Sequence, residues 1–179
     1  MKPMMEAEWF KREFNFDQPV ELFPALIERV RGTPARVEEL VRSFPPEILT
    51  RRLGERWSIQ ELVGHLYDLD ELHEGRLQDY RAGAEVLRAA DLTNKKTHEA
   101  DHNAKPVEDV LAIFREARMS FVAELEAVDE QDIGISAMHP RLGKPMRIID
   151  LAYFVAEHDD HHLAEMTFVG RSLIGVLEG

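Results

Sequence analysis

The chain of 179 residues contains no cysteine. Disulfide bonds, thiolate metal ligands and a cysteine nucleophile are therefore excluded. A metal ion would have to be bound by histidine, aspartate or glutamate side chains. A reaction that consumes a thiol would need that thiol from outside the chain.

Long apolar runs are also missing. No stretch of about 18 apolar residues, the length needed to cross a bilayer, occurs in the sequence. The opening residues, MKPMMEAEWFKREF, lack the apolar centre of a signal peptide. These two absences predict a cytoplasmic protein without a membrane partner.

Positive charge is scarce relative to negative charge. The chain has 22 lysines and arginines against 34 aspartates and glutamates, which gives a formal net charge of -12. A chain this acidic repels a phosphate backbone unless it carries a basic stripe, and the sequence shows none. We therefore expect no nucleic acid partner.

Four long segments carry apolar residues at helical spacing. The first covers about residues 19–44 and keeps one phase across the sequence RGTPAR, which indicates a single helix kinked near Gly32 and Pro34. The second begins at Ser58, where SIQE has the pattern of a capping box, and ends near Gly83.

The third segment starts at Pro106, and the fourth covers about residues 147–169, where we expect Gly170 to stop the helix. A polar crossover, residues 91–105, separates the second and third segments, and a turn-rich loop, HPRLGKP, separates the third and fourth. Strand patterns are weak throughout. Four amphipathic helices without a sheet predict a single all-α domain, residues 1–179, folded as a four-helix bundle.

The fourth segment contains the sequence VAEHDDHHLAEM, residues 155–166. At about 100° per residue, His158 and His162 lie one turn apart in the middle of the apolar face. His161 lies on the flank of that face, and Asp160 points to water. Two imidazoles one turn apart can bind one metal ion. The alternative is a pair of core histidines whose nitrogens are hydrogen-bonded.

A third ligand would come from another helix. His65 lies at the edge of the apolar face of the second segment, near its start. If the second and fourth helices run antiparallel, His65 comes to the same height as His158 and His162. Three imidazoles with water in the remaining positions are typical of an open, reactive metal site rather than a closed structural one.

Three stretches of the sequence carry a family resemblance: WSIQELVGHLYDLDELHEGRL, then DLTN…EADHN, then HPRLGKPMRIIDLAYFVAEHDDHHLAEM. Together they resemble the DinB-like superfamily over about residues 26–169. The resemblance implies an up-down-down-up four-helix bundle with a long crossover between its second and third helices. It also implies a divalent metal bound by His65, His158 and His162, a small-molecule substrate and a homodimer.

The DinB-like superfamily includes S-transferases and isomerases that use low-molecular-weight thiols. We therefore expect a metal-dependent enzyme, with S-transfer using an external low-molecular-weight thiol slightly ahead of metal-dependent hydrolysis. The expected metal is zinc or nickel, and imidazole ligands alone do not select between them. A non-catalytic metal-binding or ligand-binding bundle is the alternative. A carboxylate that closes the metal shell would favour this alternative, whereas an open cleft that reaches the metal would favour an enzyme.

Four residues are weaker catalytic candidates. Asp68 and Asp159, near the histidines on their own helices, could orient ligand imidazoles or act as a general base. His102 and Asn103, in the crossover, could contact a substrate, because functional residues often lie on loops.

Several other residues are assigned to the structure rather than to the site. His73 is explained as well by core packing as by cavity lining. His139 and Arg141 are expected to be loop residues with a solvated charge, and Trp57 a packing residue.

Overall fold

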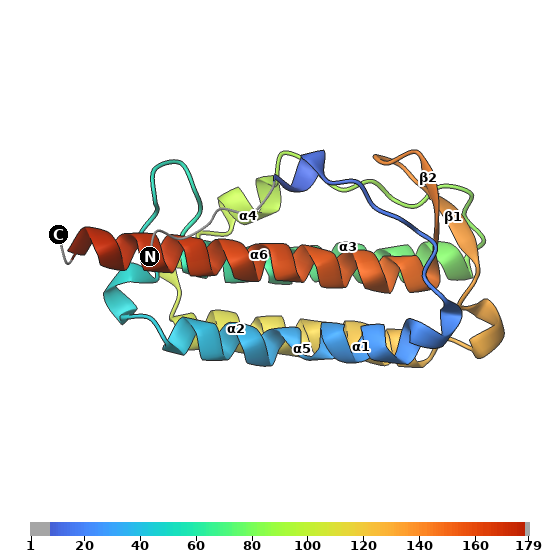
Figure 1. Ribbon diagram of the computed structural model, residues 1–179, viewed down its shortest axis with the longest axis horizontal. Coiled ribbons are helices and arrows are strands. Elements are labelled where there is room, and N and C mark those ends of the chain that lie inside the picture. The colour runs from blue at the N-terminus through green and yellow to red at the C-terminus, as the bar shows by residue number, and fades with distance from the viewer. Residues whose placement is uncertain (1–7, 178–179) are drawn as a thin grey trace.

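The structure is a computed structural model that describes residues 8–177. Its bundle helices are α1 (Phe23–Arg31), α2 (Thr33–Arg42), α3 (Ile59–Arg81), α5 (Val107–Glu126) and α6 (Ile148–Leu177). In Figure 1, α6 and α3 form one layer, and α1 and α2 form the other together with α5. Shorter helical pieces are Trp9–Lys11, Val20–Leu22, Pro46–Ile48, α4 (Lys95–Glu99), His102–Ala104 and Glu130–Asp132.

The first rod of the bundle is one helix interrupted at Gly32. Gly32 keeps helical torsion angles, φ -73° and ψ -14°, and its N–H donates to the carbonyl of Glu28 at 2.9 Å. Pro34, which has no N–H to donate, lies in the first turn of α2. Because the chain stays helical through the junction, α1 and α2 lie end to end in Figure 1, as the continuous apolar phase predicted.

The second rod begins at the predicted capping box. The N–H of Glu61 donates to Ser58 Oγ at 3.1 Å, and the N–H of Ser58 donates to Glu61 Oε2 at 2.8 Å. The colours of Figure 1 show that α3 and α5 run in one direction, whereas α1, α2 and α6 run in the other. This is an up-down-down-up bundle, so residues 82–106 must cross its whole length to connect α3 to α5.

The connection between α5 and α6 is a small antiparallel hairpin, which the sequence analysis did not predict. Strand β1 (Ser136–His139) pairs with β2 (Lys144–Arg147), and Gly143 turns the chain with φ +60°. Each strand has only four residues, which is too short for an alternation of apolar and polar residues to be recognised in the sequence. The backbone of Met138 also exchanges hydrogen bonds of 2.8 and 3.0 Å with Glu85 and Leu87, so the hairpin holds the start of the crossover.

Helix α6 continues through Gly170, so the prediction that this glycine stops the helix is wrong. A Cβ atom at Gly170 would lie 2.4–2.7 Å from ring atoms of Phe44. The glycine therefore lets the Phe44 ring pack directly on the helix backbone. A glycine that permits close packing and one that ends a helix look the same in a sequence.

The core consists of two apolar clusters with a buried polar layer between them. Arg118 of α5 makes ion pairs with Asp70 of α3, at 3.0 Å, and with Asp159 of α6. Thr33 Oγ1, at the junction of α1 and α2, donates to Asp159 at 2.6 Å. All four side chains are buried, so this layer, which we call the Arg118 cluster, ties every rod of the bundle together at mid-height.

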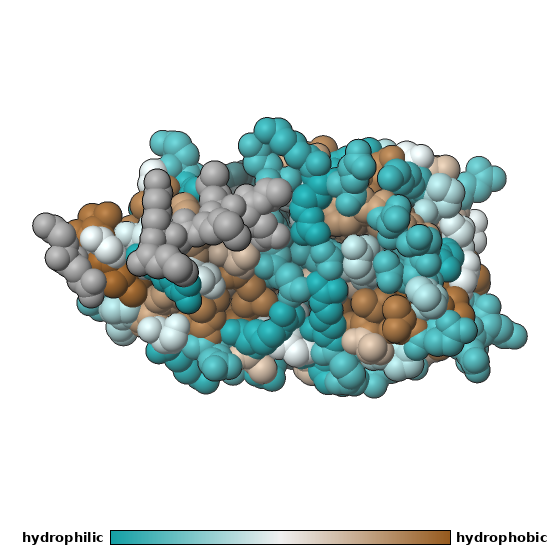
Figure 2. Space-filling view, in the orientation of Figure 1, coloured by the Kyte–Doolittle hydropathy of each residue, from teal (hydrophilic) through white to brown (hydrophobic). Residues whose placement is uncertain are grey.

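Charged residues also connect the outer edges of α6 and the first rod. Asp160 accepts hydrogen bonds from Arg36 at 2.6 Å and from Arg29, and Arg29 also reaches Glu157 at 2.6 Å. Figure 2 shows hydrophilic side chains across the middle of this face. The expectation that Asp160 points only to water is therefore wrong, because the neighbouring rod supplies two guanidinium groups.

None of the helices in the described part of the chain is both long and apolar enough to cross a bilayer.

Candidate metal centre

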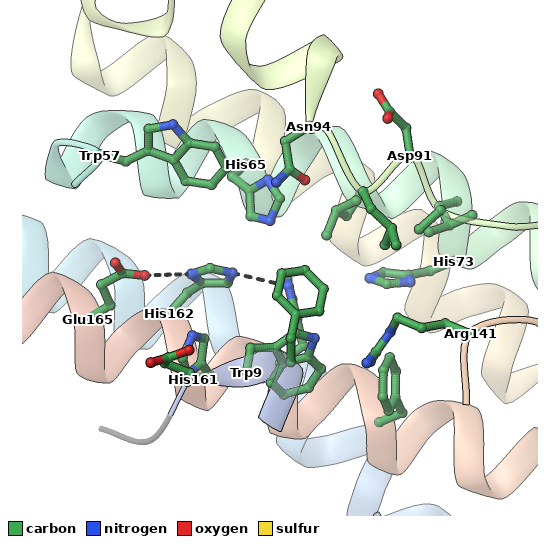
Figure 3. Close-up of a pocket in the computed structure, with 18 of the residues that line it drawn as sticks. Trp9, Trp57, His65, His73, Asp91, Asn94, Arg141, His161, His162 and Glu165 are labelled. Carbon is green, nitrogen blue, oxygen red and sulfur yellow. Dashed lines mark hydrogen bonds and ion pairs between the residues drawn. The ribbon is translucent and has the colours of Figure 1, made fainter. Parts of the chain in front are cut away.

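Three imidazoles converge between α3 and α6. His65 comes from α3, and His158 and His162 come from successive turns of α6. One ligand nitrogen from each ring lies within 4.8 Å of the other two, and Nε2 of His158 and Nε2 of His162 are 3.1 Å apart. In Figure 3 the rings of His65 and His162 face each other across the cavity. Two ligands of a tetrahedral zinc ion are separated by about 3.3 Å, so the separation of the His158 and His162 nitrogens is compatible with a shared cation.

Two of these rings have hydrogen-bond partners at Nδ1, and for His162 the partner favours one tautomer. Nδ1 of His65 lies 3.1 Å from the hydroxyl of Thr97, and Nδ1 of His162 lies 3.3 Å from Oε2 of Glu165. A carboxylate accepts, so the proton of His162 belongs on Nδ1. The Nε2 lone pair is then free for a cation, as in carboxylate–histidine–metal arrangements.

Burial keeps two of the three rings neutral. The side chains of His65 and His158 are buried, and this desolvation, together with the neighbouring His162, holds the pKa of both well below the ordinary 6.5. Neutral imidazole is the form that binds a metal ion. At pH 7, His65 and His158 would therefore not have to lose a proton before binding a cation.

An open cavity of about 840 Å³ reaches the three imidazoles. Trp57 and Trp9 stand beside it: the Trp57 ring centroid is 4.7 Å from that of His65, and the Trp9 centroid is 5.0 Å from that of His158. Both tryptophans appear in Figure 3 on opposite sides of the cluster. Trp57, expected to be a packing residue, is thus also a wall of the cavity.

A carboxylate lies beside the cluster. Oε2 of Glu165 and ring nitrogens of His161 and His162 also lie within 4.8 Å of one another. Burial alone would raise the pKa of Glu165, but the hydrogen bond with His162 and the nearby charge of Arg56 outweigh this effect, so the pKa lies below its ordinary value. His161, predicted on the flank of the face, lines the cavity, and burial lowers its pKa to about 4.

The crossover candidates have contacts away from the three imidazoles. Oδ2 of Asp68 is 2.8 Å from Nε2 of His102, and Oδ1 of Asn103 accepts from Ser58 Oγ at 2.7 Å. His102 also packs against Gly64, where a Cβ atom would lie 2.2 Å from its ring. Among the described residues these contacts dock the crossover onto α3, and neither His102 nor Asn103 lines the large cavity.

Asp159 likewise contacts Arg118 and Thr33 rather than a ligand imidazole. Asp159 is fully buried on α6. Its partner Arg118 comes from α5, and the sequence alone does not show which helix covers that side of α6.

The hairpin carries two residues whose predicted solvation is wrong. His139 is buried, and desolvation followed by the charges of Arg76 and Arg141 lowers its pKa to about 4. Arg141 lines the cavity and reaches into it below His73 in Figure 3. Both were expected in an exposed loop, but the hairpin folds back over the end of the cavity.

Sequence reasoning missed the residues that reach the site from segments without a helical pattern. Thr97 and Trp9 lie in the crossover and in the short helical turn near the N-terminus. No motif pointed to them. Glu165 had a usable signal, because it follows His162 by three residues and therefore shares its side of the helix.

The fold and this cluster define a four-helix bundle with three histidines at the wall of an open cavity. A model of the DinB superfamily matches residues 29–166, and the chain belongs to this superfamily. No curated protein matches the chain.

Two solved structures are similar to this chain. YfiT from Bacillus subtilis, described as a probable metal-dependent hydrolase with an unusual four-helix bundle topology, has a TM-score of 0.76 and 19% identity over 90% of this chain and 93% of YfiT. The colibactin self-resistance protein ClbS, solved in complex with double-stranded DNA, has a TM-score of 0.63 and 14% identity over 80% of this chain and 91% of ClbS. At these identities the similarity shows the shared fold.

The sequence analysis excluded a nucleic acid partner because of the acidic net charge, and this exclusion is wrong. ClbS, a protein of this fold, was solved in complex with double-stranded DNA. Net charge sums over the whole surface, whereas binding depends on the charge of the surface that makes contact. The descriptions of YfiT and ClbS mention neither a small-molecule substrate nor a homodimer, so these two expected partners are withdrawn as well.

Proposed function

We propose that this protein is a metal-dependent hydrolase whose divalent cation is held by His65, His158 and His162. The observation that carries the proposal is an open cavity that ends on three converging imidazoles. The description of YfiT as a probable metal-dependent hydrolase supports it. An open cavity that reaches the histidines favours an enzyme over the alternative of a non-catalytic binding bundle with a closed site.

The expected cation is zinc or nickel, because both accept imidazole ligands. When bound, such a cation supplies Lewis acidity, which lowers the pKa of water and polarises a carbonyl or phosphoryl oxygen. Thr97 and Glu165 hold the rings of His65 and His162 in the ligating orientation. Glu165 also lines the cavity as a carboxylate, so in this proposal it accepts the proton of the attacking water.

Thiol S-transfer is the second candidate. A cavity of about 840 Å³ lies within the usual range of ligand pockets and has room for a low-molecular-weight thiol beside a small electrophile. The thiol must come from outside, because the chain has no cysteine. Consumption of an added thiol together with an electrophile would favour this reaction, whereas product formation without thiol favours hydrolysis.

The metal assignment is tested by elemental analysis of the purified protein. We expect about one equivalent of metal in the wild type and loss of most of it in His162→Ala. His98→Ala is the matched control, because His98 is an exposed histidine that lines the same cavity beside Trp57 but lies outside the cluster. Equal metal content in the wild type and His162→Ala would overturn the assignment.

The roles of the two hydrogen-bond partners can be separated. Thr97→Val removes the hydroxyl at Nδ1 of His65 and should weaken metal affinity about 10-fold to 100-fold. Glu165→Gln keeps an acceptor for His162 but cannot take up a proton, so it should retain metal and lose hydrolysis. Full activity in a metal-loaded Glu165→Gln variant would remove Glu165 as the proton acceptor.

A further inference from the structure

Positive side chains gather at the end of the cavity away from Glu165. Figure 3 shows His162 and Glu165 toward one end and His73 and Arg141 toward the other. Arg76, on α3, lines the same end of the cavity. Its guanidinium lies close enough to Arg141 for the charge of Arg141 to help lower its pKa.

Arg76 is a buried cation that makes no ion pair with an acidic side chain in the described part of the chain. Its side chain is 2% exposed, and in the described part of the chain its one hydrogen bond runs from Nε to the carbonyl of Arg88 at 3.2 Å. Burial, more than any neighbour, lowers its pKa to about 10, so it still carries its charge at pH 7. Burying an unpaired charge costs several kcal/mol.

Arg141 repeats this pattern from the hairpin. Its guanidinium lies over the ring of Phe10, 5.3 Å from the centroid, and its buried Nη2 has no hydrogen-bond partner in residues 8–177. Two guanidinium groups from separate elements therefore present unused N–H donors to one end of the cavity.

The acidic residues nearby are engaged elsewhere. Asp79 binds Arg88 through both oxygens, at 2.8–3.1 Å. Asp91 accepts from Thr93 and Lys95, and Figure 3 shows its carboxylate turned away from Arg141. Of the other acidic residues that line the cavity, Glu8 pairs with Lys11, Glu165 pairs with Arg56 and His162, and Glu55 is exposed.

His73 adds an unsatisfied polar group to the same end of the cavity. It is 3% exposed, and neither of its ring nitrogens has a hydrogen-bond partner among the described residues. Its ring centroid lies 6.5 Å from that of His158, so it also lies close to the three-imidazole cluster. Burying a ring whose two nitrogens make no hydrogen bond is unfavourable in free energy, unless a polar group enters the cavity and binds them.

We infer that Arg76, Arg141 and His73 form an oxyanion-binding subsite, so that the substrate carries a carboxylate or phosphate group held opposite the metal-ligating histidines. Guanidinium groups bind both kinds of oxyanion through paired N–H donors. The anion supplies the negative charge that residues 8–177 do not provide at this end. The identity of the substrate class rests on the proposed function, whereas anion binding does not depend on any reaction.

Anion binding is tested on metal-free protein near pH 7.5, so that the probes cannot bind to a metal ion. Calorimetric titration with inorganic phosphate, succinate and dimethyl phosphate separates free phosphate, carboxylate and the diester of a nucleic acid backbone. We expect Arg141→Gln and Arg76→Gln to weaken binding of the preferred probe about tenfold or more. The control is Arg81→Gln, since Arg81 is an exposed arginine on the same helix that pairs with Glu124.

The reaction is tested separately with the metal-loaded protein on two activated esters, p-nitrophenyl acetate and p-nitrophenyl hemisuccinate. Arg141→Gln should lower the ratio of kcat/KM for the anionic ester to that for the neutral ester about tenfold, and Arg81→Gln should not. If neither ester is hydrolysed, the proposed hydrolase fails while the titration still decides the subsite. The subsite is refuted if no probe binds the wild type, or if all probes bind Arg141→Gln as tightly. Arg141 lies in a hairpin at the surface end of the cavity, so this variant keeps the test valid even if Arg76→Gln does not fold.

Discussion

Replacing Arg118 with methionine should destabilise the fold strongly. Arg118 is fully buried in the polar layer at mid-height of the bundle, where it contacts Asp159 through both terminal nitrogens and Asp70 through Nε. Methionine fills much of the same volume but leaves two buried carboxylates with no cation. Removing one partner of a buried ion pair typically costs about 3–5 kcal/mol.

For a chain of this length, that loss corresponds to a fall in Tm of roughly 6–20 °C. The free energy of unfolding would be measured by urea denaturation and the Tm by calorimetry, both on metal-free protein. Arg115→Met is the matched control: Arg115 lies on the same helix, is 43% exposed and pairs with Glu38 at 2.6 Å. An exposed pair contributes about 0–1 kcal/mol, so this variant should stay close to the wild type.

A second comparison tests the cause. Adding Asp70→Asn and Asp159→Asn to Arg118→Met removes the unpaired carboxylates, and the triple variant should lose less stability than the single one. The explanation is refuted if Arg118→Met costs less than about 1 kcal/mol, or if neutralising the two aspartates makes the loss larger.

Three further predictions concern packing, pH and metal. Gly170→Ala should cost about 1–3 kcal/mol in chemical denaturation because its Cβ meets the Phe44 ring, whereas Gly175→Ala, with open space around it, should cost nothing. The metal-free protein should lose stability as the pH falls through about 6.5, measured by urea denaturation at a series of pH values, because the unfolded chain takes up protons near that ordinary pKa and the folded chain does not. Burial raises the pKa of Asp70 to about 7, so this carboxyl group stabilises the folded protein as the pH falls. Its effect on stability is smaller than the combined opposite effect of three buried imidazoles with lowered pKa, those of His65, His73 and His158. Stability that instead rises steadily from pH 7 to pH 5.5 would contradict this sign. Chelating the metal should lower the Tm by roughly 5–10 °C if the metal was present at about 100 times its dissociation constant, and an unchanged calorimetric Tm would contradict binding at a folded site.

The sequence predicted those parts of the site that follow from helical periodicity. His158 and His162 lie one turn apart on the inner face of α6 because the helix period puts them there. His65 required one further assumption, that its helix runs antiparallel to α6, and the bundle satisfies it. The same reasoning predicted the bundle itself and the start of α3 at the capping box.

The parts that could not be predicted depend on which segments meet. Thr97 reaches His65 because the crossover folds back onto α3, and no local pattern encodes that return. Arg141 looked like a solvated loop residue because the hairpin that carries it was not recognised. Asp159 was a weaker candidate for orienting an imidazole or acting as a general base, whereas its partner is Arg118, on a helix whose neighbours cannot be read from the sequence.

The crossover between α3 and α5 has two structural roles. It spans the bundle so that two parallel helices can be joined, and residues 89–98 of it also supply part of the wall of the cavity. The four rods pack against one another without this wall, so apart from Thr97, which hydrogen-bonds His65, its residues are free to vary while the histidines stay in place. A bundle built in this way can acquire new specificities by exchange of these loop residues, with the three-histidine cluster unchanged.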